Sequence, residues 1–133
     1  MSKRSRVRGR LRLVTALMLG YWCLLFIATH VPLPAVKAIG ANDKLIHFAG
    51  YATLAFLAAW ALSQKSALTW KGYLTVWLVV ALYGVVDELL QMIPMLHRSA
   101  DRQDWYADIL GAACALIVYW LWIEVRRRLS TSR

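Results

Sequence analysis

The sequence contains four apolar stretches, each close to the length of a membrane-spanning helix, and they limit the folds open to this chain. The first covers 13–31 and contains 19 residues without a charge. At about 1.5 Å per residue, a helix of that length crosses a hydrocarbon core of about 30 Å. The other three cover 45–62, 72–93 and 105–123. The pattern predicts an all-α, polytopic membrane protein, built as a bundle of four transmembrane helices.

Composition supports a membrane protein rather than a soluble one. The chain is 60% hydrophobic and 17% charged, whereas soluble domains are about 45–50% apolar. Its 133 residues suit one domain. We therefore expect one four-helix transmembrane domain over 13–123, between a basic tail over 1–12 and a second basic tail over 124–133.

The basic residues predict how the spans are oriented. Of 16 Lys and Arg residues, twelve lie in the two tails and at the ends of 65–71, and four lie in the connections on the other side. Cytoplasmic flanks carry excess Lys and Arg, so both termini are predicted to be cytoplasmic. The net charge of +9 is then mainly a topology signal, with some affinity for anionic membrane lipids. No nucleic-acid partner is expected, since the basic residues line no soluble face.

The N-terminal segment superficially resembles a secretory signal with a cleavage site over 35–38. Its apolar run is longer than the ~7–15 residues usual for the apolar region of a signal peptide. Lys37 also lies inside the cleavage motif, where a lysine is unusual. We therefore expect an uncleaved anchor. Cys23 and Cys114 lie within predicted spans and indicate neither a disulfide nor a zinc site.

Polar residues gather at the predicted outer ends of the spans. Asp43 and His47 lie four residues apart at one end, and Glu88 and Gln91 lie three apart at another. Asp87, four residues before Gln91, can face inward together with Glu88. At the fourth span, acids recur on one helical stripe if the helix begins early: Asp101, Asp104 and Asp108. Because a carboxylate in hydrocarbon costs about 2.5–3.5 kcal/mol, we expect several of these groups to share one pocket.

Each of these residues also has a purely structural interpretation. Asn42 or Asp43 can cap the second span, and His47 can be a core histidine bonded to Glu88. Glu88 and Gln91 can join helices by hydrogen bonds. The exposed acids of the stripe can pair with basic residues on either side: Arg98 and Arg102.

Three of these motifs together resemble the VanZ-like family of small bacterial membrane proteins. They are Asp43-Lys44-x-x-His47-Phe48, Glu88-Leu89-Leu90-Gln91, and Arg98 followed by Asp104, Asp108 and Gly111. Family members usually have Asn where this chain has Asp108, so this chain carries an added negative charge. The resemblance implies a multi-pass protein of the bacterial cytoplasmic (inner) membrane, with the cell envelope as its place of action. It also implies a link to resistance against the glycopeptide teicoplanin.

The first functional hypothesis is that the outer pocket binds an envelope lipid or cell-wall precursor and so alters the response to glycopeptides. Lys44 and Arg98 would contact a phosphate or carboxylate through charge-assisted hydrogen bonds. Three further residues would orient those basic groups: Glu88, Gln91 and Asp104. Asp43 and Asp108 complete the predicted ligand-binding set.

A second hypothesis makes the same pocket catalytic. His47 or Glu88 would act as general base on a lipid-linked phosphate or ester. A divalent cation, Mg²⁺ or Ca²⁺ rather than zinc, would be held by Asp104, Asp108 and Glu88. Proton-coupled transport is disfavoured because the acids stay at one interface. A fourth possibility is a module whose polar cluster only closes the bundle and acts through a partner protein. The sequence leaves open whether a metal is bound, what the ligand is and which oligomer forms.

Overall fold

The computed structural model describes residues 3–30, 42–93 and 101–131, and within these ranges the chain forms helices and no strand. Side chains are described from residue 5 onward in the first range. The helices are α1 (Lys3–His30), α3 (Asp43–Ser63), α4 (Trp70–Gln91) and α5 (Arg102–Thr131). The predicted all-α architecture is confirmed.

All four helices are long and apolar enough to cross a membrane. The shortest, α3, has 21 residues and spans about 31 Å at 1.5 Å per residue. A helix satisfies its own backbone hydrogen bonds, which lipid cannot do. The chain is therefore a multi-pass integral membrane protein with four candidate spans in its described part.

Two helices extend beyond the predicted spans. α1 begins at Lys3, ten residues before the predicted first span, and α5 continues to Thr131, eight residues after the predicted fourth. Lys, Arg and Leu are good helix formers, so the basic segments continue the helical backbone although they are too polar to cross hydrocarbon.

Side chains next to the helix starts explain where the helices begin. The Asn42 side chain accepts a hydrogen bond from the Lys44 amide at 3.1 Å, so Asn42 rather than Asp43 caps α3. Asp101 accepts from the Gln103 amide at 2.8 Å, which sets the early start of α5 at Arg102. Both contacts satisfy amides that have no partner within the first helical turn.

The helices pack where small residues let the backbones approach. A Cβ atom on Gly111 of α5 would overlap the Phe48 carbonyl oxygen of α3, and one on Gly50 of α3 would lie 2.7 Å from a Leu25 methyl group of α1. Two indole N–H groups then fix α4 against α5: Trp77 donates to the Ile109 carbonyl at 3.1 Å and Trp105 to the Ala81 carbonyl at 3.0 Å.

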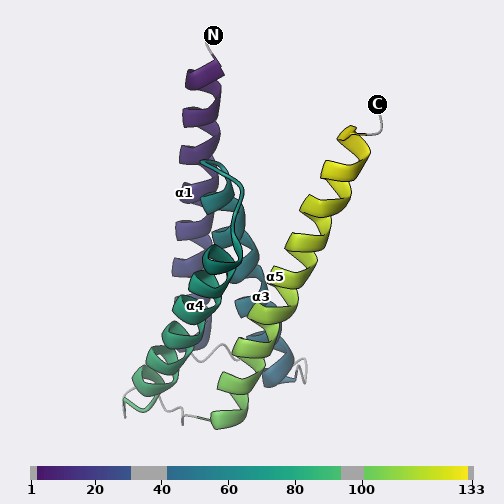
Figure 1. The fold of residues 1–133 in the computed structure, drawn as a ribbon. Helices are drawn as coiled ribbons and strands as arrows, with labels where there is room; N and C mark the ends of the chain where they lie inside the picture. Colours follow the sequence, from purple (N-terminus) through teal and green to yellow (C-terminus); the bar gives the residue numbers. More distant parts are fainter. Residues whose placement is uncertain (1–2, 31–41, 94–100, 132–133) are drawn as a thin grey trace.

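The apolar core lies mainly between α3, α4 and α5. Its buried members include Tyr51, Leu54, Ala55, Ala59, Val76, Val80, Ala112, Leu116 and Tyr119. Both termini lie at one end of the bundle, where α1 and α5 diverge (Figure 1). The opposite end is formed by the last turn of α1, the start of α3, the end of α4 and the start of α5, and we call it the polar end.

Candidate functional site

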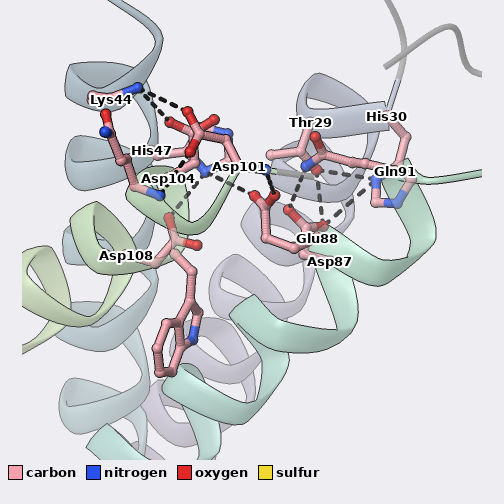
Figure 2. A network of polar contacts seen from close by, with 12 residues as sticks. Thr29, His30, Lys44, His47, Asp87, Glu88, Gln91, Asp101, Asp104 and Asp108 are labelled. Carbon is pink, nitrogen blue, oxygen red and sulfur yellow. Dashed lines mark hydrogen bonds and ion pairs between the residues drawn. The ribbon is translucent and has the colours of Figure 1, made fainter. Parts of the chain in front are cut away.

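The polar end brings together side chains from all four helices (Figure 2). We call this group the polar cluster: Thr29, His30, Lys44, His47, Asp87, Glu88, Gln91, Asp101, Asp104 and Asp108. The i, i+4 spacing of Asp104 and Asp108 turns both carboxylates inward, where both are buried. The same spacing on α4 buries Asp87 and Gln91.

His47 lies at the centre of the cluster and is 1% exposed. Its Nδ1 is 3.0 Å from Asp108 Oδ1 and 4.0 Å from Glu88 Oε1. The sequence interpretation of a histidine bonded to Glu88 is therefore corrected: the hydrogen bond goes to Asp108, and Glu88 approaches as a second carboxylate. Gly84 makes room for Asp108, whose Oδ2 would lie 3.0 Å from a Cβ atom at that glycine.

Lys44 forms the rim of the cluster. Its Nζ donates to Asp101 Oδ2 at 3.1 Å and to Asp104 Oδ1 at 3.5 Å. The Lys44 side chain is 42% exposed, whereas that of Asp104 is 7% exposed, so the ammonium group is still accessible to an approaching anion. The acids predicted to pair with Arg98 and Arg102 thus contact Lys44 in the structure.

Asp101 precedes α5 and joins two parts of the cluster. Its backbone N–H donates to Glu88 Oε2 at 2.8 Å, which ties the end of α4 to the start of α5. The hydrogen bond from the Gln103 amide lowers the pKa of the Asp101 carboxyl below its ordinary value, and the hydrogen bond from the Lys44 ammonium group is the next largest cause. Asp101 therefore stays ionised at neutral pH and keeps Lys44 in place.

Asp87 forms a second centre beside the first and is fully buried. Thr29 Oγ1 donates to Asp87 Oδ1 at 3.0 Å, and Gln91 Nε2 donates to Asp87 Oδ2 at 3.3 Å. His30 Nδ1 lies 3.5 Å from Asp87 Oδ1 and 2.9 Å from the Phe26 carbonyl oxygen. Asp87 therefore joins the last turn of α1 to α4.

Each buried carboxylate of the polar cluster has at least one hydrogen-bond partner, but two of their oxygens have none within the described chain. Four carboxylates are buried: Asp87, Glu88, Asp104 and Asp108. Among the described residues, Glu88 Oε1 and Asp108 Oδ2 are buried without a hydrogen-bond partner. An unpaired buried carboxylate oxygen is costly, and a bound proton, water or cation would satisfy these two atoms.

Two groups of side chains have the spacing that a metal ion needs. One ligand atom from each of His47, Glu88 and Asp108 lies within 4.8 Å of the others, and all three residues are buried. The second group combines His47 with Asp43 and Asp104, and its Asp43 is exposed. The predicted cation ligands are Asp104, Asp108 and Glu88, whereas the structure groups Asp108 and Glu88 with His47.

The predicted site residues fall into three groups in the structure. Those that it brings into the polar cluster are Lys44, His47, Glu88, Gln91, Asp104 and Asp108. Asp43 lies at the exposed start of α3, next to the cluster, and Arg98 lies outside the described residues. Thr29 and His30 were not among the predicted site residues. Their signal is a pair of polar residues in the last turn of an apolar span, where such groups face the bundle interior.

The fold and this cluster together define a class: four-helix integral membrane proteins with buried ionisable groups at one end of the bundle. The model of the VanZ/LLP1 family matches residues 24–123. The chain therefore belongs to the VanZ/LLP1 family, as the motifs at the span ends predicted. Comparison with curated proteins finds no match, and comparison with solved structures finds none either.

Proposed function

We propose that this protein binds a phosphate-bearing component of the bacterial cell envelope at the polar cluster, through a divalent cation. One observation carries the proposal: His47, Glu88 and Asp108 are buried and offer three ligand atoms within 4.8 Å of one another. The two carboxylate oxygens that are buried without a partner among the described residues, Glu88 Oε1 and Asp108 Oδ2, belong to the same trio.

A divalent cation fits the charge of this trio. Two carboxylates and one neutral imidazole supply two negative charges, which one such cation would neutralise. Carboxylates suit Mg²⁺, Ca²⁺ and Mn²⁺. Three protein ligands leave coordination positions for ligand oxygens, because Mg²⁺ is six-coordinate and typically binds through a few carboxylates together with substrate phosphates.

Lys44 supplies the second contact to an anionic ligand. Its half-exposed ammonium group lies at the rim, held by Asp101 and Asp104. A phosphate that reached the cation would therefore also accept charge-assisted hydrogen bonds from Lys44. Arg98, predicted to act with Lys44, remains a prediction.

The test uses purified protein in detergent, with polyprenyl phosphate as the probe and polyprenol, which lacks the phosphate, as its comparison. Retention of each lipid is measured by native mass spectrometry with Mg²⁺ or with a chelator. We expect polyprenyl phosphate to be retained only with Mg²⁺, and Glu88→Gln to abolish that retention. Glu124→Gln, which removes a carboxylate at the other end of the bundle, should not. Equal retention with chelator would contradict the proposal.

The basic tails support an orientation in which the polar end faces away from the cytoplasm, where cell-wall precursors and glycopeptides are encountered. A bacterial host that expresses the protein should then show altered susceptibility to teicoplanin, and expression of His47→Ala at the same level should not alter it. If the parent and His47→Ala changed susceptibility equally, the antibiotic response would not depend on this site.

A second candidate function is catalysis at the same cluster, favoured by the 3.0 Å contact between His47 Nδ1 and Asp108 Oδ1. A carboxylate that orients an imidazole is typical of general-base catalysis. His47, or Glu88, would then activate water against a lipid-linked phosphate or ester. Release of inorganic phosphate from polyprenyl diphosphate, dependent on Mg²⁺ and on His47, tests this candidate; no release over that of the His47→Ala variant counts against it.

A further inference from the structure

A cavity lies at the end of the bundle opposite the polar end, where α1 and α5 diverge. The function proposed for the polar cluster does not involve it. Its volume is about 510 Å³, and its lining comes from α1, α3, α4, α5 and the turn between α3 and α4. The size falls in the range of small-molecule sites, about 300–1,000 Å³. We call it the basic cavity, after the arginines that line it.

One wall of the basic cavity is aromatic. The lining includes Trp60, Tyr73, Tyr119, Trp120 and Trp122. The Tyr119 hydroxyl is already paired with Ser63 Oγ at 2.6 Å, so this part of the wall has little unmet demand for hydrogen bonds. Such a wall suits hydrocarbon, or the ester region of a lipid, better than a fully hydrated solute.

The remaining wall is positively charged. Arg10 from α1 and two arginines from α5, Arg126 and Arg127, line the cavity, and Glu124 is the only acid among the described lining residues. Three positive charges less one negative leave +2. Glu124 Oε2 lies 2.6 Å from Arg127 Nη2 and its Oε1 lies 3.0 Å from Arg128 Nε. The acid is thus engaged by neighbours on its own helix, which leaves Arg10 and Arg126 as the cations with most freedom to bind.

The helix lengths place this cavity at a membrane interface. α3 ends at Ser63 and α4 begins at Trp70, whereas α1 and α5 continue past that level and diverge (Figure 1). Aromatic residues typify the depth at which hydrocarbon gives way to headgroups. At that depth, each basic side chain attracts anionic lipid by about 1 kcal/mol.

We propose that one anionic phospholipid binds in the basic cavity, with its phosphate between Arg10 and Arg126 and its acyl chains against the aromatic wall. The lipid would bridge the diverging ends of α1 and α5. Arg126 forms a cation–π contact with Trp122, whose ring centroid lies 5.1 Å from the guanidinium carbon. This site does not depend on the polar cluster or on a cation.

The test compares phosphatidylglycerol with phosphatidylcholine of the same acyl chains, by native mass spectrometry of the full chain in detergent with chelator present. We expect the parent to retain phosphatidylglycerol preferentially. Arg10→Gln and Arg126→Gln should each weaken retention about fivefold, the equivalent of about 1 kcal/mol per arginine. The matched control is Arg8→Gln, on the same helix but outside the cavity lining, and it should change retention less than twofold. Helical content by circular dichroism checks that each variant is folded.

Several results would overturn the proposal. Equal losses for Arg8→Gln and Arg10→Gln would mean that diffuse charge, not the cavity, attracts the lipid. Equal retention of phosphatidylcholine would exclude an anion-selective site. Displacement of phosphatidylglycerol by glycerol phosphate at similar concentration would make the cavity a site for a soluble phosphate instead.

Discussion

Replacing Gly111 with alanine tests how the fold positions the site. A Cβ atom there would overlap the Phe48 carbonyl oxygen and lie 3.0 Å from the carbonyl carbon. These are backbone atoms, so no rotamer change relieves the overlap and α5 must move away from α3. Overpacking typically costs about 1–3 kcal/mol, and the better helix propensity of alanine returns about 0.5–1 kcal/mol. We expect a net loss of about 1–2 kcal/mol.

The same displacement should disturb the polar cluster, since Asp108 lies one turn before Gly111 and His47 is adjacent to Phe48. Divalent-cation affinity should therefore fall together with stability. The assay is unfolding by sodium dodecyl sulfate in mixed micelles, followed by circular dichroism. Gly20→Ala is the matched control: nothing lies within 4 Å of a Cβ atom at Gly20, so this variant should be more stable than the parent. If Gly111→Ala were as stable as Gly20→Ala, the close α3–α5 approach would be refuted.

Three further predictions follow from single contacts. Trp105→Phe loses the hydrogen bond to the Ala81 carbonyl and should cost about 1 kcal/mol in the same unfolding assay; an unchanged midpoint would show that this bond does not hold α4 to α5. Thr29→Val keeps the side-chain shape but removes the 3.0 Å donor of Asp87 Oδ1, which retains the Tyr83 hydroxyl at 3.5 Å. The variant should therefore destabilise by about 1 kcal/mol, the net value of one hydrogen bond, and a neutral result would contradict the role of Asp87 in holding α1. Asp101, whose pKa is lowered in the folded chain, contributes stability that is present above its ordinary pKa and lost as the pH falls through the lowered value. As the pH is reduced from about 5 to about 2, the melting temperature should therefore fall more steeply for the parent than for Asp101→Asn, and an equal pH dependence of the two melting temperatures would refute this.

The spans and the inward stripes were predictable because both are local properties of the chain. Apolar length marks a membrane helix, and i, i+4 spacing marks one face, as for Asp104 and Asp108. The helical start of the basic tail was not predicted, because hydropathy detects insertion rather than backbone conformation. The residues of Lys3–Arg12 favour a helix, but they are too polar to form part of a membrane span.

The pairing of side chains across helices was less predictable. Sequence placed His47, Glu88 and Asp108 at one end of the bundle, but the choice of Asp108 as the hydrogen-bond partner of His47 depends on how closely α3 and α5 approach. Likewise, Lys44 reaches Asp101 and Asp104 only because α3 and α5 begin side by side. Such contacts are set by rotation and translation between helices, which helical spacing does not encode.

Pulsed electron paramagnetic resonance of Mn²⁺ bound to the purified protein can show whether His47, Glu88 and Asp108 together hold a divalent cation. We predict one bound Mn²⁺ per chain with hyperfine coupling to a single histidine nitrogen. That coupling should vanish in His47→Ala, while Glu88→Gln and Asp108→Asn should bind Mn²⁺ more weakly and Glu124→Gln should bind it as the parent does. Mn²⁺ bound without nitrogen coupling, or bound equally by Glu88→Gln and the parent, would show that these three residues do not form the cation site.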